Sequence, residues 1–571
     1  MLLLLSLLLV SCGGEPTPPV EPDAPSSDPN EELGEAPSDK FNFYHDGELL
    51  SVIIIPEKPT AEEREIARRV LNAVFQRARK ELEIISDSEF TEAPKGAIII
   101  GSTTLAESVA AYSSLPERGA IVKVEDGKLV IAFDRIVSAN LLTTELIAAM
   151  TGDYKSTLSI PLDLSLSVTT LPTIEDLPEL QGSESYFCGE KSDMLYADAT
   201  PESFDAYCDS MKDAGFDVTS ERESEGNRFA TFVGHDLYAY VYYTAYSGKI
   251  RVITGPIETL AEEDYSTDTQ KTYTPYIASI PQPNNGLGLI MRLPDGRFII
   301  HDGGYSGGDR VYKTLRQLKP EGEIVIAAWF VSHPHGDHYV GFTDFIKSHG
   351  KDSFVTIERV MLNFAEPKRY VVKTDDMDED CSSNATYVYK TIKSYIPNVP
   401  VIEVHTGQVF DFGDATVEVL YTVEDIMPIS LPNVNDSSLV IRFESADTSF
   451  MILADTCYKS GPILNDMWGD YLKSDIVQVA HHGQWPSVES IYHSIAAEVV
   501  LVPAVTSRYK SDISDSRWSK QTKAILGYAK DLYTTCDEII RLDLPYVIKN
   551  NKDEMVEYIK SYVPKEGEPT S

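Results

Sequence analysis

The chain has 571 residues, of which 42% are hydrophobic, and a formal net charge of −40 at pH 7. Its length predicts about two to four domains, and its hydrophobic content is ample for globular cores. The acidic balance disfavours nucleic acid as a partner, because protein affinity for that polyanion depends largely on Lys and Arg at phosphates. After the N-terminus, no stretch is long and apolar enough to span a bilayer.

Residues 1–40 have the composition of a lipoprotein signal peptide and a disordered tether. Met1–Val10 is apolar, and Leu9-Val10-Ser11-Cys12 resembles the lipobox of bacterial lipoproteins, in which the Cys is lipidated and becomes the mature N-terminus. Pro16–Lys40 is rich in Pro, Glu, Asp and Ser, a composition typical of a disordered segment. We therefore expect an extracytoplasmic protein anchored to the cell membrane through lipid at Cys12.

Residues 41–178 alternate strand and helix patterns and predict an α/β domain. Thr60 followed by Glu63 forms a capping-box pattern at the start of an apolar helical repeat. Two apolar runs flank Glu125–Lys128, which predicts a hairpin. Ala97–Ile100 is expected to be a buried strand.

Residues 182–262 predict a small α+β domain. Thr200-Pro201-Glu202 opens a helix, and Tyr-rich strands follow. The alternating Tyr238, Tyr240 and Tyr242 fit a half-buried strand face, which we favour over the lining of a sugar or choline pocket.

The cysteines are isolated along the chain and lack CxxC spacing, which favours buried thiols over a disulfide framework. Cys188 with Cys208 is the one pair that we would test for a bridge.

Residues 277–550 carry the candidate chemistry, and residues 551–571 are expected to form a C-terminal tail. The apolar run Ile324–Val331 leads directly into His333-Pro334-His335-Gly336-Asp337-His338. Imidazole and carboxylate side chains are natural ligands for a divalent cation. At this spacing His333 and His335 can share one metal ion while Asp337 and His338 turn toward a second. A His-rich loop without metal is the less favoured interpretation.

With this motif, the chain resembles a metallo-β-lactamase-fold hydrolase, which implies a C-terminal αββα sandwich. Further motifs follow in that family's order. His301-Asp302-Gly303-Gly304 ends a strand ahead of the metal loop, Asp455 follows the buried strand Met451–Ala454, and His481-His482-Gly483 follows another strand. The more specific likeness is to the hydrolase domain of ComEC-type competence proteins, whose Asn-x-x-Ser-Leu-Val is similar to Asn435–Val440 here.

The resemblance implies a ligand set for one or two divalent ions, with zinc expected and manganese as the alternative. That set is His333, His335, Asp337, His338, Asp455 and His481. Of the adjacent imidazoles, we expect His481 to be the ligand because it directly ends its strand, and His482 to protonate the leaving group or contact the substrate. Asp337 would also orient the attacking hydroxide. Asn435, Ser438, Tyr339 and Lys459 are candidates for substrate contact.

The family's lactamase-like members carry a further His ligand between the HxHxDH motif and the bridging Asp. The candidates here are His349 and His405, both of which we expect at the surface. Without that ligand, a true β-lactamase is the weaker hypothesis.

The resemblance implies hydrolysis of phosphodiester or related ester bonds by metal-activated hydroxide, on a small-molecule or cell-envelope substrate. The alternative is a lipoprotein that binds envelope carbohydrate or acts as a scaffold, with a vestigial hydrolase fold.

Overall fold

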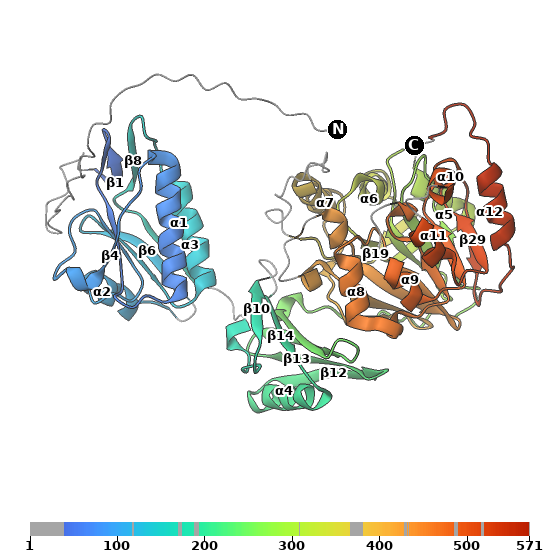
Figure 1. Cartoon of the computed structure of the whole chain (residues 1–571), viewed down its shortest axis with the longest axis horizontal. Helices are drawn as coiled ribbons and strands as arrows, with labels where there is room; N and C mark the ends of the chain where they lie inside the picture. The colour runs from blue at the N-terminus through green and yellow to red at the C-terminus, as the bar shows by residue number, and fades with distance from the viewer. Residues whose placement is uncertain are drawn as a thin grey trace, which may run out of the picture. The chain divides into compact units, whose positions relative to one another are not determined.

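The computed structural model of the chain describes residues 39–569 except for several short segments. Those segments are 117–118, 170–173, 188–192, 308, 366–380, 427–430, 432, 485–488 and 515–518. The expected lipobox, including Cys12, lies outside the described residues, and so does Cys188 of the pair suggested for a bridge. Two compact units, Met1–Leu171 and Pro172–Ser571, make up the chain (Figure 1). Among the described helices, none has the length and apolar character needed to cross a membrane.

The first unit is an α/β domain with a six-stranded sheet of order β4-β3-β5-β7-β6-β9 and a smaller sheet of order β2-β1-β8. Its elements are β1 (Lys40–His45), β2 (Glu48–Leu49), β3 (Val52–Ile55), α1 (Ala61–Ala78), β4 (Ile84–Ser86), β5 (Ala97–Ile100), α2 (Ala106–Ser113), β6 (Gly119–Glu125), β7 (Lys128–Phe133), α3 (Ile136–Ala149), β8 (Thr157–Pro161) and β9 (Ser165–Thr169). Strands β4, β3, β5 and β7 run parallel, while β6 is antiparallel to both of its neighbours.

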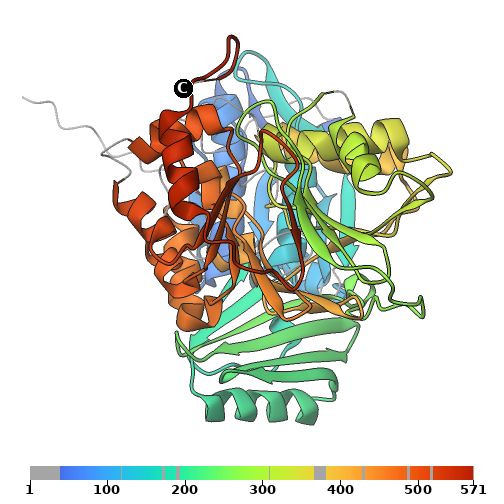
Figure 2. The same cartoon turned by 90° about the vertical axis from the view of Figure 1, so that its right-hand side faces the viewer.

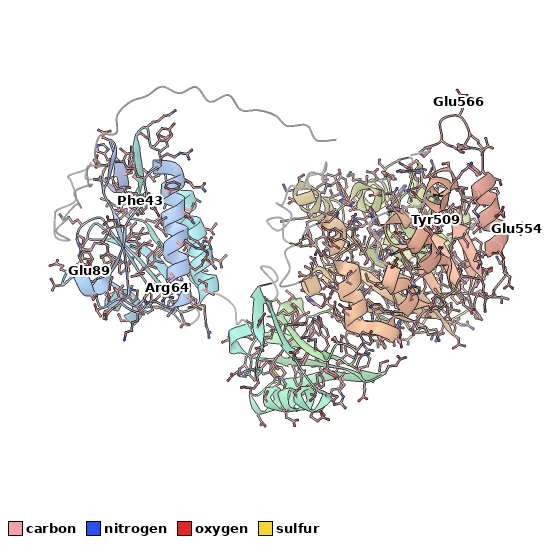
Figure 3. The ribbon with its side chains drawn as sticks, in the orientation of Figure 1. Phe43, Arg64, Glu89, Tyr509, Glu554 and Glu566 are labelled. Carbon is pink, nitrogen blue, oxygen red and sulfur yellow. The ribbon has the colours of Figure 1, made fainter. Side chains whose placement is uncertain are left out.

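Local sequence signals in this unit are confirmed. Thr60 caps α1 and Glu63 returns a side-chain contact to the Thr60 backbone, so the capping box is complete. The carboxylate of Glu63 also accepts from the backbone of Ser102 at 2.7 Å, which ties the helix start to the end of β5. The predicted hairpin is β6 and β7, paired down to Glu125 opposite Lys128. Phe43 is fully buried in the core of this unit (Figure 3).

The second unit begins with an antiparallel six-stranded sheet of order β10-β11-β15-β14-β13-β12. Its elements are β10 (Glu184–Phe187), β11 (Asp193–Asp198), α4 (Pro201–Asp213), β12 (Asp217–Ser224), β13 (Asn227–Gly234), β14 (Leu237–Thr244) and β15 (Lys249–Pro256). One face of β14 packs on α4 through Ala239 and Val241. The opposite face carries the tyrosine stripe, which is buried against the rest of the unit and not half-exposed.

The remainder of the second unit is a sandwich of two mixed sheets. The first has the order β22-β21-β19-β18-β17-β16-β30, with β20 also paired to β19, and the second has the order β23-β24-β25-β26-β27-β28-β29. The strands of the first are β16 (Tyr276–Ser279), β17 (Gly288–Arg292), β18 (Phe298–Asp302), β19 (Ile324–Val331), β20 (Val355–Ile357), β21 (Val360–Leu362), β22 (Val401–Glu403) and β30 (Arg541–Asp543). Those of the second are β23 (Val409–Asp411), β24 (Ala415–Tyr421), β25 (Val440–Ser445), β26 (Thr448–Ile452), β27 (Ile476–Gln478), β28 (Val499–Val502) and β29 (Asp531–Thr534).

Helices cover the outer face of each sheet, as Figure 2 shows. They are α5 (Arg310–Leu318), α6 (Gly336–His349) and α7 (Cys381–Tyr395) on one side, and α8 (Ser460–Trp468), α9 (Glu489–Ile495), α10 (Thr506–Ser514), α11 (Ser519–Leu526) and α12 (Lys552–Ser561) on the other. Alternation along β19 explains the layers, since Phe330 faces the inter-sheet core and Trp329 faces the α6 side. The predicted αββα sandwich is confirmed.

Two details differ from the sequence-based expectations. His405 is buried, not at the surface, and its ring nitrogens lie 2.9 Å from the Tyr238 hydroxyl and 2.9 Å from a Glu424 oxygen. Residues 551–571 include α12, whose Ile559 is fully buried, and so they are not only a tail. Cys208 is a buried free thiol, as favoured for the isolated cysteines.

Candidate metal centre

The HxHxDH motif lies where β19 meets α6. Three residues separate the end of β19 at Val331 from His335, which occupies the N-cap of α6, and Asp337 and His338 lie in the first helical turn. The extended strand and the helix start hold His333 and His338 close together, with ring centroids 4.2 Å apart. The loop therefore brings the imidazoles of His333 and His338 together.

A first group of possible ligand atoms comes from His333, His335 and Asp455, all within 4.8 Å of one another. Nε2 of His333 lies 3.8 Å from Oδ2 of Asp455 and 3.1 Å from Nδ1 of His335. Burial and the neighbouring imidazoles hold the pKa of His333 well below its ordinary value. The ring is therefore neutral, as a metal ligand must be.

A second group comes from Asp337, His338 and His482, also within 4.8 Å. Nε2 of His482 lies 3.1 Å from Oδ2 of Asp337 and 3.5 Å from Oδ2 of Asp455. Nε2 of His338 lies 3.2 Å from Oδ1 of Asp455. Asp455 therefore contacts members of both groups, which is the arrangement of a carboxylate placed between two ions.

Several atoms of these groups are buried without a hydrogen-bond partner in the described structure: Nε2 of His338, Nε2 of His482 and Oδ1 of Asp455. Unpaired buried polar atoms are costly and rare. They face one another, so a cation among them would satisfy all three, and the donor set fits zinc or manganese.

The electrostatics point the same way. Burial lowers the pKa of the His482 imidazole, but the Asp455 carboxylate and the contact with Asp337 outweigh burial and raise it to about 9. Burial would raise the pKa of Asp455, yet His338 and His482 hold it well below its ordinary value. The Asp337 and Asp455 carboxylates therefore favour positive charge at this site. Protons on the imidazoles supply part of that charge, and a divalent ion would supply more.

Asp302 orients the His338 ring of the second group through its Nδ1 atom. Its Oδ2 accepts from Nδ1 of His338 at 2.8 Å and from Oγ of Ser332 at 2.7 Å, while its Oδ1 accepts from the Ser332 backbone at 2.8 Å. The bond on Nδ1 fixes the tautomer of His338 and leaves Nε2 for a metal. The sequence pointed to Asp302 by its place before the glycine turn, but nothing in the sequence singled out Ser332.

Asp455 is delivered by a tight turn after β26. Ala454 adopts a positive φ of 47°, and the side chain of Gln478 accepts from the backbone of Leu453 at 2.9 Å and of Ala454 at 2.7 Å. Gln478 belongs to the neighbouring strand β27, so an amide side chain clamps the turn that carries the ligand. Sequence reasoning missed Gln478, because an amide within an apolar strand looks like any other polar substitution.

His481 and His482 exchange the places that the sequence suggested. Both have a positive φ, 48° and 56°, in a short turn after β27. His482 joins Asp337 and His338, and its Nδ1 donates to the Pro503 carbonyl at 2.9 Å, which leaves Nε2 facing the carboxylates. His481 lies in neither group of candidate ligands found among the described residues, and its Nε2 is 3.3 Å from Nδ2 of Asn435.

The four candidates for substrate contact fall in different places. Asn435 is beside the site through His481, and its Oδ1 has no hydrogen-bond partner in the described structure. Ser438 is fully buried, accepts from the Asp455 backbone at 3.2 Å and lies 3.3 Å from Nδ1 of His333, which makes it a support for the ligands. Tyr339 donates to Asn384 on α7, and Lys459 begins α8 with its ammonium 5.7 Å from the Tyr458 ring centroid.

His405 and His349, the candidates for the further His ligand of lactamase-like proteins, do not reach the site. His405 contacts Glu424 and Tyr238 where the β10–β15 sheet packs on the sandwich. His349 stacks on Tyr312 at 4.0 Å and bonds to Asp352 at 2.7 Å.

No family model matches the chain, and no curated protein does. Among solved structures, it is similar to a mutant of CmlA beta-hydroxylase, with 15% identity, 51% of each chain covered and a TM-score of 0.26. It is also similar to a HARLDQ-motif metallo-beta-lactamase of Cronobacter sakazakii (Enterobacter sakazakii), with 14% identity, 45% of this chain and 90% of that chain covered, and a TM-score of 0.24. MEM-A1, a subclass B3 metallo-beta-lactamase from a soil metagenome library, has 13% identity, 46% and 92% coverage and a TM-score of 0.22.

The chain spans about half the length of the hydroxylase that it matches, 51%. The order of the two sheets and their outer helices make the C-terminal part an αββα sandwich, and the candidate ligand cluster lies at its β19–α6 junction.

Proposed function

We propose that the C-terminal sandwich is a metal-dependent hydrolase that cleaves phosphodiester or related ester bonds. The observation that carries the proposal is the pair of buried contacts that Asp455 makes, with Nε2 of His338 at 3.2 Å and with Nε2 of His482 at 3.5 Å. These contacts bring three possible ligand atoms together from three separate elements, as a metal site requires.

His333, His335 and Asp455 would hold one ion, and Asp337, His338 and His482 the other, with Asp455 in reach of both. This assignment replaces His481 by His482, because the bond from Nδ1 of His482 to Pro503 leaves Nε2 directed at Asp337. Zinc is the expected ion and manganese the alternative, since nitrogen and carboxylate ligands suit both.

When bound, divalent metal supplies Lewis-acid polarisation of a substrate oxygen and lowers the pKa of water toward neutrality. Residues of the chain orient the attacking water and contact the substrate. Asp337 is the most accessible of the carboxylates, with 21% of its side chain exposed against 2% for Asp455, so we assign it the orientation of the attacking water. His481 and Asn435 lie beside the ligands but outside both ligand groups, and we assign them substrate contact.

The substrate class follows from charge and from the site. A formal net charge of −40 disfavours long nucleic acid as substrate, which leaves small or envelope-derived phosphodiesters and esters as the proposed class.

We also propose that the protein is anchored outside the cytoplasm through lipid on Cys12, with residues 13–40 as a tether. The support is the Leu9–Cys12 sequence and the composition of the segment that follows it. Cys12→Ser should move the protein from the membrane to the soluble fraction, and a variant that stays in the membrane fraction would contradict the anchor.

The hydrolase proposal is tested by a turnover screen. Metal-free protein, prepared with a chelator, is reloaded with zinc or manganese and offered phosphodiester, phosphorylcholine, lactone and β-lactam substrates. Turnover that depends on metal and disappears in Asp337→Ala supports the proposal. Binding of envelope carbohydrate with no metal uptake would support the scaffold alternative instead.

A further inference from the structure

The short loop Asn284–Gly286, between β16 and β17, contacts the side chains of Arg508 and Tyr305 and the backbone of Asp337, a member of the second ligand group. Nη1 of Arg508 donates to Oδ1 of Asn284 at 2.9 Å. A Cβ placed on Gly286 would lie 3.1 Å from the ring of Tyr305 and 3.2 Å from the carbonyl oxygen of Asp337. Arg508 and Tyr305 therefore flank the same loop, and that loop touches the backbone of a candidate metal ligand.

The segment that carries Arg508 is held against the site from the opposite sheet. The Pro503 carbonyl accepts from Nδ1 of His482 at 2.9 Å and from the Gly286 backbone at 3.3 Å. Helix α10 begins at Thr506, so Arg508 lies in its first turn, shortly after the residue that orients His482. The guanidinium thus has its place fixed by contacts on both sides of the sandwich.

Arg508 and Tyr305 both have hydrogen-bond donors that no partner uses in the described structure. Arg508 forms no ion pair within the described part of the chain, and its one side-chain bond is to the neutral amide of Asn284. The Tyr305 side chain is half-buried, and burial followed by the Asp337 charge raises its pKa to about 12, while Arg508 lowers it. The phenol therefore keeps its proton as a donor, and it lies within electrostatic reach of both the ligand carboxylate and the guanidinium.

We propose that Arg508 and Tyr305 form an anion subsite that binds the non-bridging oxygens of a phosphodiester while its ester bond lies at the metal centre. This inference rests on the proposed hydrolase function and narrows its substrate class. A guanidinium fork matches phosphate oxygens in a bidentate way, and a phenolic hydroxyl supplies a third donor. A neutral ester would leave the guanidinium without an anion.

The test compares an anionic and a neutral substrate, bis(4-nitrophenyl) phosphate and 4-nitrophenyl acetate, on zinc-loaded protein. Arg508→Gln should lower kcat/KM for the phosphodiester by about 10- to 100-fold, the range of a lost charge-assisted hydrogen bond, and change the neutral ester by less than about twofold. Tyr305→Phe should act in the same direction with a smaller loss. The matched control is Arg316→Gln on α5, since among the described residues Arg316 also bonds only to uncharged groups, Tyr312 and Gly322. An equal loss on both substrates, or no loss, would overturn the subsite.

A second readout separates this subsite from the hydrolase proposal. Calorimetric titration of zinc-loaded protein with inorganic phosphate should show binding about 10-fold weaker in Arg508→Gln than in the wild type. If the wild type turns over neither substrate, the hydrolase proposal fails while the titration still decides the subsite. Equal phosphate affinity in the two proteins at equal zinc content would refute the role of Arg508.

Discussion

Oδ2 of Asp302 lies 2.8 Å from Nδ1 of His338, and neither side chain has any exposed surface. Asp302 has a positive φ of 57°, an uncommon conformation for a residue other than glycine. The strand end is thus shaped to aim a carboxylate at the back of a ligand imidazole, an arrangement that recurs where histidines bind metals.

The first prediction concerns this contact. Asp302→Asn should reduce zinc affinity by about 10- to 100-fold, because the amide no longer holds the His338 tautomer with the strength of a carboxylate. Competition with a chromophoric chelator measures the change. Asp295→Asn provides a control, since Asp295 pairs with Arg297 and contacts no candidate ligand in the described structure. An Asp302→Asn protein that binds zinc as tightly as the wild type would show that the contact has only a structural role.

The second prediction separates the adjacent histidines. His482→Ala should lose the ion of the second group, because its Nε2 is the imidazole nitrogen 3.1 Å from Asp337. His481→Ala should keep its metal content and lose turnover, because His481 lies outside both ligand groups. Metal analysis after gel filtration distinguishes them, and the reverse pattern would restore His481 as the ligand.

The third prediction concerns a buried ion-pair network that joins the six-stranded β10–β15 sheet to the sandwich. Glu418 accepts from Arg222 of β12 at 2.9 Å and from Arg442 of β25 at 2.5 Å. Glu418→Gln should lower the free energy of unfolding by about 3–5 kcal/mol, since it leaves buried Arg442 without its main counter-charge. Glu444→Gln is the matched control: Glu444 also pairs with Arg442 but is 52% exposed, so its loss should cost less than about 1 kcal/mol. Similar losses in the two variants, measured by denaturant titration, would contradict this account.

The fourth prediction concerns pH. Burial lowers the pKa of His405, but the adjacent Glu424 carboxylate outweighs burial, and the net pKa is raised. A raised pKa in the folded state adds stability that is fully present below the unfolded value of about 6.5 and is lost as pH rises through the folded pKa. The stability difference between wild type and His405→Gln should therefore shrink as pH rises above about 6.5. Glu424→Gln should show the same trend, and a difference that stays constant with pH would refute it.

The sequence predicted the parts of this molecule that local chemistry determines. Thr60 with Glu63 marks a helix start by itself, and the apolar run before His333 identifies a strand that ends in ligands. The order of motifs along the chain resembles that of metallo-β-lactamase-fold hydrolases, and this resemblance implied the sandwich.

Contacts between distant segments could not be predicted in the same way. Ser332, Gln478 and Pro503 support ligands through hydrogen bonds that depend on which strands become neighbours. His405 was expected at the surface because a Thr-Gly turn follows it, yet Tyr238 of the β10–β15 sheet packs over it and bonds to its ring. The choice between His481 and His482 also depended on the positive-φ turn that holds both residues, which the apolar pattern of the preceding strand does not predict.

The two-ion site is tested by the metal content of the wild type and of Asp455→Ala after equilibration with zinc, measured by mass spectrometry of the purified proteins. Asp455 contacts both ligand groups, at 3.8 Å from His333 and 3.2 Å from His338. We expect about two equivalents of zinc in the wild type and, in the variant, loss of both ions and of turnover. A wild-type protein that binds no zinc or manganese, or an Asp455→Ala variant that retains its full metal content, would contradict it.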